Sequence, residues 1–168
     1  MRLFVAAWPP AEVVSLLAEL PRPAVKGVRW TRPDQWHVTL RFLGNVDDVE
    51  SVVEALRAVR AARATAVMGP AVGRFGHRVL HVPVEGLKEV AGAVVAATAG
   101  IGEPPDDRPF RGHITLARVA DRARVDLRPL AGTALSASWP VDEVALVVSR
   151  LAPTGARYEI VDRFTIAV

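Results

Sequence analysis

The chain has 168 residues, no cysteine, and a hydrophobic fraction of 51%. This length favours one compact domain, 1–168, with a substantial core, and the lack of cysteine excludes disulfides and thiolate metal sites. No apolar run reaches the roughly 18–20 residues that a membrane span needs, and the N-terminal segment does not have the long apolar region of a signal peptide. We therefore expect a cytoplasmic monomer with no membrane partner.

The net charge is only +3, yet the isoelectric point is about 10.1. Nearly all of the cations are arginines, because lysine occurs only at positions 26 and 88. The planar guanidinium matches phosphate, which favours a nucleic acid or a nucleotide as the partner. A GC-rich genome produces the same excess of Arg, Ala, Val, Gly and Pro, so the charge alone does not identify the ligand.

Hydrophobic periodicity predicts a mixture of strands and helices. In the first half of the chain, the predicted elements are a strand over 2–7, a helix over 11–20 ended by Pro21, a short strand over 28–30, a turn over 31–34, a strand over 36–43, and an amphipathic helix over 49–62. In the second half, they are a strand over 65–75 interrupted at Gly69-Pro70, a hairpin at 75–77, a strand over 78–84, a helix over 86–99, a loop over 100–109, a strand over 112–119, a short helix or loop over 123–130, and strands over 135–139, 141–149 and 157–166. This order is an α+β pattern.

The most informative feature is a repeated tetrapeptide. His37-Val38-Thr39-Leu40 recurs as His113-Ile114-Thr115-Leu116, which is 113 − 37 = 76 residues later. Each copy follows a predicted helix, which predicts two lobes related by a pseudo-twofold axis. Because residues i and i+2 of a strand share a face, each histidine shares a face with its threonine, and the aliphatic residues face the core.

Two imidazoles and two hydroxyls on one surface suit acid–base chemistry at phosphorus. In an in-line displacement the attacking oxygen loses a proton and the leaving oxygen gains one. Two histidines can share these steps near neutral pH, and threonine hydroxyls can donate to the non-bridging oxygens. We therefore predict that no metal or other cofactor is needed, and that the catalytic residues are His37, Thr39, His113 and Thr115.

Segments beyond the tetrapeptides carry a family resemblance. They are Met1 to Ala6, Arg29-Trp30-Thr31 leading to His37 to Gly44, Arg108 to Arg118, and Ser149-Arg150-Leu151 followed by Tyr158. The chain resembles the RNA 2′,3′-cyclic phosphodiesterase (2′-5′ RNA ligase) family of the two-histidine, or 2H, phosphoesterases over nearly its whole length. Members of that family often have proline before the second histidine; Gly112 in its place is expected to loosen the entry to the strand.

The resemblance implies a bilobal α+β fold, in which two pseudo-symmetric lobes with antiparallel sheets line a central cleft and helices pack outside. It also implies metal-independent hydrolysis of an RNA 2′,3′-cyclic phosphodiester end to a 2′-phosphomonoester. In that scheme His113 is the general base, His37 is the general acid, and the two threonines hold the non-bridging oxygens.

Three alternatives stay open. The same histidines could ligate RNA halves through a 2′-5′ linkage, with a ribose hydroxyl in place of water. The substrate could be a small cyclic phosphate derived from a nucleotide rather than RNA. The chain could also be a non-catalytic RNA-binding adaptor, although the intact His and Thr pairs argue against it.

Three arginines are candidates for substrate binding. Arg41 lies four residues after His37 and Arg111 lies two residues before His113, so strand alternation places both on the histidine face. Arg118 lies five residues after His113, so it reaches that face only if a β-bulge intervenes.

Phe75, in a glycine-flanked hairpin, is the aromatic residue that we predict to stack a base. Trp36 and Tyr158 could also stack, although a core position is favoured for each. His77 and His81 are four residues apart but have no accompanying carboxylate or thiol cluster. We therefore predict no metal site.

Overall fold

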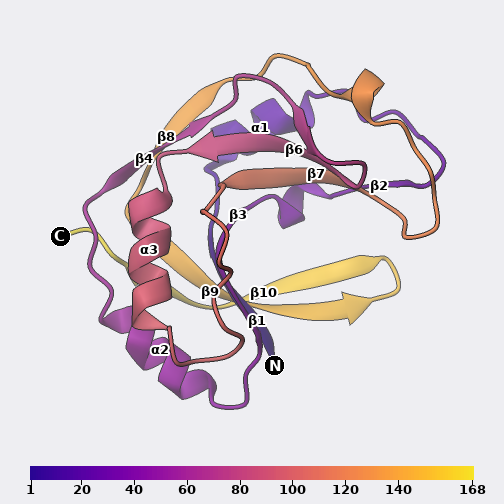
Figure 1. The fold of residues 1–168 in the computed structure, drawn as a ribbon. Helices are drawn as coiled ribbons and strands as arrows, with labels where there is room; N and C mark the ends of the chain where they lie inside the picture. The colour runs from indigo at the N-terminus through magenta and orange to yellow at the C-terminus, as the bar shows by residue number, and fades with distance from the viewer.

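The computed structural model describes all residues from 1 to 168, and its strands build one curled antiparallel sheet (Figure 1). The strand order is β10-β9-β1-β3-β7-β6-β4-β8, with β2 paired to β7 and β5 paired to β6. The strands are β1 (Arg2–Ala7), β2 (Val28–Trp30), β3 (Val38–Asn45), β4 (Ala64–Met68), β5 (Gly73–Phe75), β6 (Val79–Glu85), β7 (His113–Val119), β8 (Ala137–Val141), β9 (Glu143–Ala152) and β10 (Gly155–Thr165). The helices are α1 (Ala11–Ala18), α2 (Val49–Arg57) and α3 (Lys88–Ala97), with 3-10 turns η1 (Pro33–Gln35) and η2 (Arg128–Leu130).

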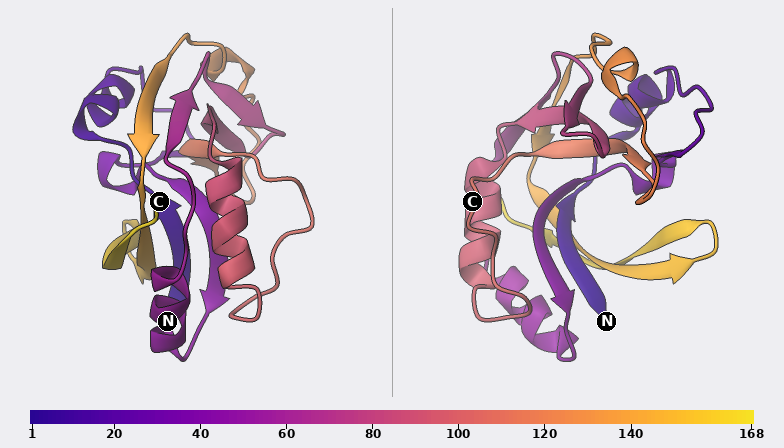
Figure 2. Two further views of the ribbon diagram at one scale, coloured as in Figure 1. Left: turned by 90° about the vertical axis from the view of Figure 1, so that its left-hand side faces the viewer. Right: turned by 45° about the vertical axis from the view of Figure 1, so that its right-hand side comes forward.

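The sheet consists of two halves that meet at one residue pair. The first half contains β10, β9, β1 and β3, and the second half contains β7, β6, β4 and β8. Val38 of β3 pairs with Ile114 of β7, and this pair joins the two halves. Figure 2 shows the β9–β10 hairpin extending away from the rest of the first half, which gives the sheet its curl. The predicted two-lobed α+β fold is confirmed.

Two of the helices follow a strand of one half of the sheet but pack on the other half. α1 follows β1 of the first half, but its Leu17 borders the same small apolar hollow as Leu80 of β6 and Leu116 of β7. α3 follows β6 of the second half, but it packs on β3 and α2. A single core of 35 buried residues therefore runs through both halves.

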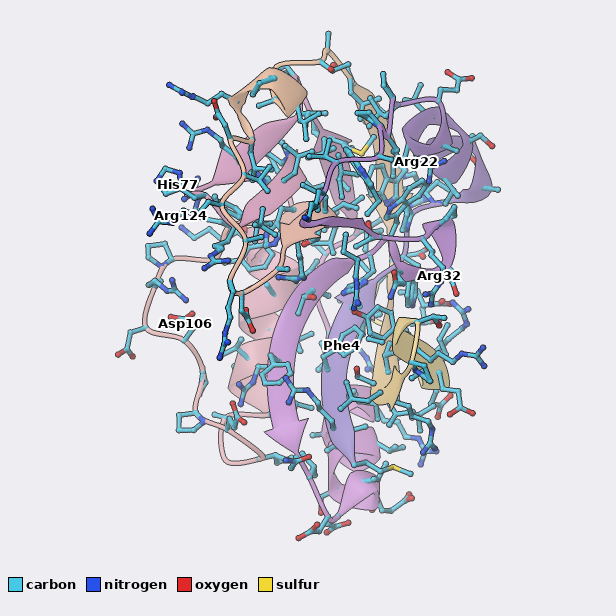
Figure 3. The ribbon with its side chains drawn as sticks, turned by 90° about the vertical axis from the view of Figure 1, so that its right-hand side faces the viewer. Phe4, Arg22, Arg32, His77, Asp106 and Arg124 are labelled. Atoms are coloured by element: carbon cyan, nitrogen blue, oxygen red, sulfur yellow. The ribbon has the colours of Figure 1, made fainter.

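The opposite face of the first half carries a smaller apolar cluster of Phe4, Ala6, Ala145 and Val147. We call this side of the curled sheet the inner face. Figure 3 shows Phe4 on it, near the centre of the view. None of the helices has the length and apolar content needed to cross a membrane.

Most predicted elements differ from the structure by one to three residues at an end, and two differ by more. α2 ends at Arg57 rather than at residue 62, because Ala61 donates its N–H to the carbonyl of Ile166 (2.9 Å) instead of continuing the helix. The predicted strand over 65–75 is two strands, β4 and β5. Gly69, with φ of +115°, turns the chain between them, so that β4 pairs with β8 and β5 pairs with β6.

Candidate active site

The two tetrapeptides lie side by side where the halves meet. Val38 and Ile114 pair in antiparallel register and are fully buried. In this antiparallel register His37 lies opposite Thr115, and Thr39 lies opposite His113. The polar residues of the two copies are all partly exposed: His37, Thr39, His113 and Thr115.

Both imidazoles are held in the same way. Nδ1 of His37 lies 2.7 Å from the carbonyl oxygen of Gln35, and Nδ1 of His113 lies 2.8 Å from that of Arg111. A carbonyl oxygen only accepts, so Nδ1 carries the proton and donates it. Nε2 of each neutral ring is then an acceptor, and Nε2 of His37 accepts from the hydroxyl of Thr39 (2.9 Å).

Each tetrapeptide has a β-bulge at its leucine. The pairing of β3 with β1 skips Leu40, and the pairing of β7 with β6 skips Leu116. A bulge shifts strand alternation by one residue, so the residue five positions after each histidine turns to the inner face. That residue is Phe42 in the first copy and Arg118 in the second.

The bulge in β7 brings Arg118 to the histidines, as the prediction that invoked a bulge required. Its side chain is exposed, and its positive charge contributes to lowering the pKa of His37 and of His113. The same charge also acts on the Tyr158 hydroxyl. Arg118 therefore adds positive potential at the centre of the site.

The prediction that Arg41 faces the histidines is wrong. The bulge at Leu40 turns it to the helix side, where it is only 4% exposed. Its guanidinium donates to the carbonyl oxygens of Ile101 (3.2 Å) and Glu103 (2.7 Å) and to the hydroxyl of Thr98 (3.4 Å). Arg41 thus ties the segment after α3 to β3 and is not available to a substrate.

Three aromatic rings surround His37 on the inner face. The ring centroids of Phe4, Trp8 and Tyr158 lie 4.9, 5.2 and 5.2 Å from that of the imidazole. Tyr158 comes from β10, and burial raises the pKa of its hydroxyl. The favoured core position for Tyr158 is met only in part, because its ring packs on the smaller apolar cluster but stays partly exposed beside His37.

A second group of rings surrounds His113. Phe75 meets it edge-on, with centroids 4.8 Å apart, and His81 lies 5.6 Å away. Phe75 is stacked on His81 at 3.8 Å, and the guanidinium of Arg111 lies 4.9 Å from the same Phe75 ring. The structure therefore brings Arg111 to the second histidine, as strand alternation predicted, and it brings Phe75 there as well, which the sequence did not predict.

His81 belongs to this site, although the sequence gave no sign that it would lie beside His113. It is 6% exposed, and its Nδ1 is buried without a hydrogen-bond partner. Its spacing from His77 drew attention only to a metal pair. His77, in contrast, is exposed in the turn between β5 and β6, so the two imidazoles do not act together.

Burial keeps these imidazoles neutral. Desolvation lowers the pKa of His37 to about 4 and that of His81 to about 4, and it also lowers the pKa of His113. When His113 becomes protonated at acid pH, its charge further opposes protonation of His37 and His81. At pH 7 the free protein therefore presents unprotonated Nε2 atoms at His37 and His113, whose Nδ1 atoms carry the proton.

Thr31 braces the bulge in β7. Its hydroxyl lies 2.8 Å from the carbonyl oxygen of Thr115 and 2.9 Å from that of Leu116, and its N–H donates to Leu116 (2.8 Å). The indole N–H of Trp36 donates to the same hydroxyl (3.0 Å), and Trp36 is buried in the core as favoured. The conspicuous Arg29-Trp30-Thr31 segment thus fixes the strand end that carries Thr115.

Gly112 does not loosen the entry to β7. Its carbonyl accepts from the N–H of Val84 at 2.9 Å, so it extends the pairing of β7 with β6. A Cβ at this position would collide with the carbonyl oxygen of Val84. The expectation of a looser strand entry is therefore wrong: glycine allows a close approach of the two strands just before His113.

The environment of the site includes a pocket of about 210 Å³ beside Trp8. It is lined by Ala6 of β1, by Trp8 just after that strand, by residues 140–145 where β8 turns into β9, and by Arg163 of β10, and neither catalytic candidate pair lines it. No group of three or more His, Asp or Glu side chains is placed to hold a metal ion.

Comparison with known proteins defines the class of this protein. Residues 8–152 match the sequence model of the 2′-5′ RNA ligase superfamily, and the chain belongs to that superfamily. It is 31% identical to the RNA 2′,3′-cyclic phosphodiesterase of Thermus thermophilus, over an alignment of 189 residues that covers 99% of this chain and 90% of the relative. The family resemblance inferred from the motifs is confirmed.

Solved structures support the same assignment. The fold is similar to that of TT0787 of Thermus thermophilus, with a TM-score of 0.80, 30% identity, and coverage of 99% of this chain and 98% of that chain. It is also similar to E. coli LigT in complex with 3′-AMP, with a TM-score of 0.77, 26% identity, and coverage of 98% and 97%. The comparisons support a phosphoesterase or ligase of this superfamily.

Proposed function

We propose that the protein hydrolyses RNA 2′,3′-cyclic phosphodiester ends to 2′-phosphomonoesters without a metal ion. The observation that carries this proposal is the matched pair of histidines. In each one, Nδ1 donates to a carbonyl two residues earlier, which leaves Nε2 as the nitrogen that exchanges a proton on the inner face. The Thr39 hydroxyl that donates to Nε2 of His37 in the free protein would turn to the phosphate of the substrate. Two such groups supply the one proton acceptor and the one proton donor that an in-line displacement needs.

In the proposed reaction, His113 takes a proton from water through Nε2 as the water oxygen attacks phosphorus. The bond between phosphorus and O3′ breaks on the opposite side, and His37 gives a proton from its Nε2 to the departing O3′. The phosphate stays on O2′, so the product is a 2′-phosphomonoester. Thr39 and Thr115 donate to the non-bridging oxygens, where negative charge accumulates.

The substrate itself supplies the condition for acid catalysis. His37 is neutral in the free protein, because burial lowers its pKa to about 4. A bound phosphodiester carries a negative charge beside the imidazole, which raises the pKa of the ring. Protonation of His37 is therefore coupled to substrate binding, and a proton is taken up when the anion arrives.

Three further side chains have roles in this proposal. Arg118 neutralises charge on the scissile phosphate, because it is the arginine whose charge both histidines experience. Arg111 provides a second contact to the phosphate. Phe75 offers the terminal base an aromatic surface beside His113.

The test uses RNA ending in a 2′,3′-cyclic phosphate, incubated with and without EDTA. EDTA-resistant formation of a 2′-phosphate is expected, and His37→Ala and His113→Ala should each lower the rate by at least about 10²-fold. His77→Ala, which removes an exposed imidazole, is the control. Near wild-type turnover by either site variant, or turnover that EDTA abolishes and a divalent metal restores, would contradict the proposal.

Ligation is a second candidate, because the family model that matches the chain is that of the 2′-5′ RNA ligase superfamily. A ribose hydroxyl would replace water as the nucleophile, and the same two histidines would move the protons. Incubation of a cyclic-phosphate end with a 5′-hydroxyl RNA separates the two reactions, since ligation yields a longer RNA and hydrolysis does not. Binding without either product would favour the adaptor.

A further inference from the structure

Beside Arg118, which the proposed reaction uses, lies a second arginine that this reaction does not require. Arg29 of β2 pairs directly with Arg118 of β7, so the two side chains project from the same face as neighbours. Both are exposed, and neither forms an ion pair with a carboxylate. Like charges directly opposite one another destabilise a sheet, and an anion bound across them would remove that repulsion.

The positive region continues from Arg29 to the tip of the β9–β10 hairpin. A Cβ on Gly155 would lie 3.7 Å from Nη1 of Arg29 and 4.0 Å from Nη1 of Arg32, so the two guanidiniums converge on the same hairpin residue. Figure 3 shows Arg32 just above this hairpin, on the side of the molecule opposite to His77 and Arg124. The arginines thus extend in one direction away from the histidines.

The nearby carboxylates leave the Arg29–Arg118 pair uncompensated. Asp34 is paired with Arg32 at 3.2 Å, and Glu159 of the hairpin is paired with Arg150 at 2.6 Å. Arg32 also donates to the backbone of the hairpin tip, so it has a structural function there. Arg29 is therefore the guanidinium next to Arg118 that is free to bind a ligand.

We propose that Arg29, together with Arg118, binds the internal phosphodiester that lies one nucleotide upstream of the cyclic phosphate. This inference rests on the proposed function, because it takes the cyclic end to lie between the two histidines. Arg118 then stands between two successive phosphates of one strand, and Arg29 contacts the outer one. The substrate class that follows is RNA of two or more nucleotides, rather than a mononucleoside cyclic phosphate.

The experiment compares a mononucleotide with a dinucleotide in both binding and turnover. Calorimetry measures the affinity for adenosine 2′-phosphate and for ApA that carries a terminal 2′-phosphate, and kinetics measure kcat/KM for the corresponding 2′,3′-cyclic phosphates. The wild-type protein should prefer the dinucleotide by about tenfold, which is typical of one charge-assisted hydrogen bond. Arg29→Gln should reduce this preference to about twofold or less, and the salt dependence of dinucleotide binding should weaken by about one counterion.

Arg63→Gln is the control, because Arg63 is exposed in the segment between α2 and β4, away from the histidines. It should keep the full dinucleotide preference. Equal affinity of the wild type for the two ligands, or an unchanged preference in Arg29→Gln, would overturn the inference. If neither cyclic phosphate is hydrolysed, the proposed function fails, and the two binding affinities still decide the role of Arg29.

Discussion

Replacement of His81 by leucine should make the protein less sensitive to acid. His81 is 6% exposed and its Nδ1 has no partner. Burial lowers its pKa from 6.5 to about 4. Between these two pKa values the unfolded chain binds a proton at His81 and the folded chain does not. The free energy of unfolding is therefore highest above pH 6.5 and falls as the pH decreases towards 4.

The size of the effect follows from the two pKa values. At pH 5, an imidazole with a pKa of 6.5 when unfolded and about 4 when folded lowers the free energy of unfolding by about 2 kcal/mol relative to neutral pH. His37 has the same folded pKa of about 4, so the two residues together account for about 4 kcal/mol. His81→Leu should remove about half of this acid sensitivity.

Urea unfolding at about pH 8 and at about pH 5 measures the difference directly. The quantity to compare is the loss of unfolding free energy between the two pH values in the wild type and in His81→Leu, because other titrating groups contribute equally to both. His77→Leu controls for the removal of an exposed histidine from the same hairpin. An identical loss in the wild type and in His81→Leu would refute the reasoning that His81 is buried and neutral.

Three further outcomes are expected. Burial lowers the pKa of both His37 and His113, so the state with one proton shared between the two histidines is most abundant below pH 6.5. The pH profile of kcat/KM should therefore peak on the acid side of 6.5. A peak above about pH 7.5 would contradict the acid–base assignment. Arg41→Met leaves buried carbonyls without their donor and should lower the free energy of unfolding by about 3 kcal/mol in a urea titration, and an unchanged midpoint would show that Arg41 is not a brace. Gly112→Ala forces β7 away from the Val84 carbonyl and should cost about 1–3 kcal/mol as well as reduce turnover, whereas wild-type values for both would mean that the strands can separate without consequence.

The sequence was sufficient for the elements and for the centre of the site. The apolar pattern of a helix or strand predicts that element when its apolar side chains face the core. In this protein the apolar side chains of most helices and strands do face the core. The His-x-Thr spacing also survives folding, because positions i and i+2 share a face in any strand. His37 and His113 therefore lie together as the repeat predicted.

The side-chain directions beyond the threonines were not predictable from one strand alone. A bulge depends on how the neighbouring strand pairs. Here the neighbours are β1 for β3 and β6 for β7, and each is separated from its partner by at least a helix and a loop in the sequence. The same one-residue shift turned Arg41 into the core and Arg118 towards the histidines. Strand alternation gave the wrong direction for the first and required a bulge for the second.

The groups around each histidine were also beyond the reach of local patterns. Tyr158 reaches His37 from the last strand of the chain, and His81 reaches His113 from a hairpin that the sequence presented as a weak metal motif. Both positions depend on long-range strand order. The burial that lowers the pKa of the imidazoles therefore arises only when the whole sheet has formed.

The exchange of α1 and α3 between the halves has a consequence for how this protein can change over time. The duplicated His-x-Thr motif suggests two modules, but a helix from each half packs on the other half. Neither half could therefore be removed or replaced without disturbing the core of the other. A substitution that changes the packing beneath one histidine would also change the packing beneath the other. The two halves of the site are therefore expected to evolve together.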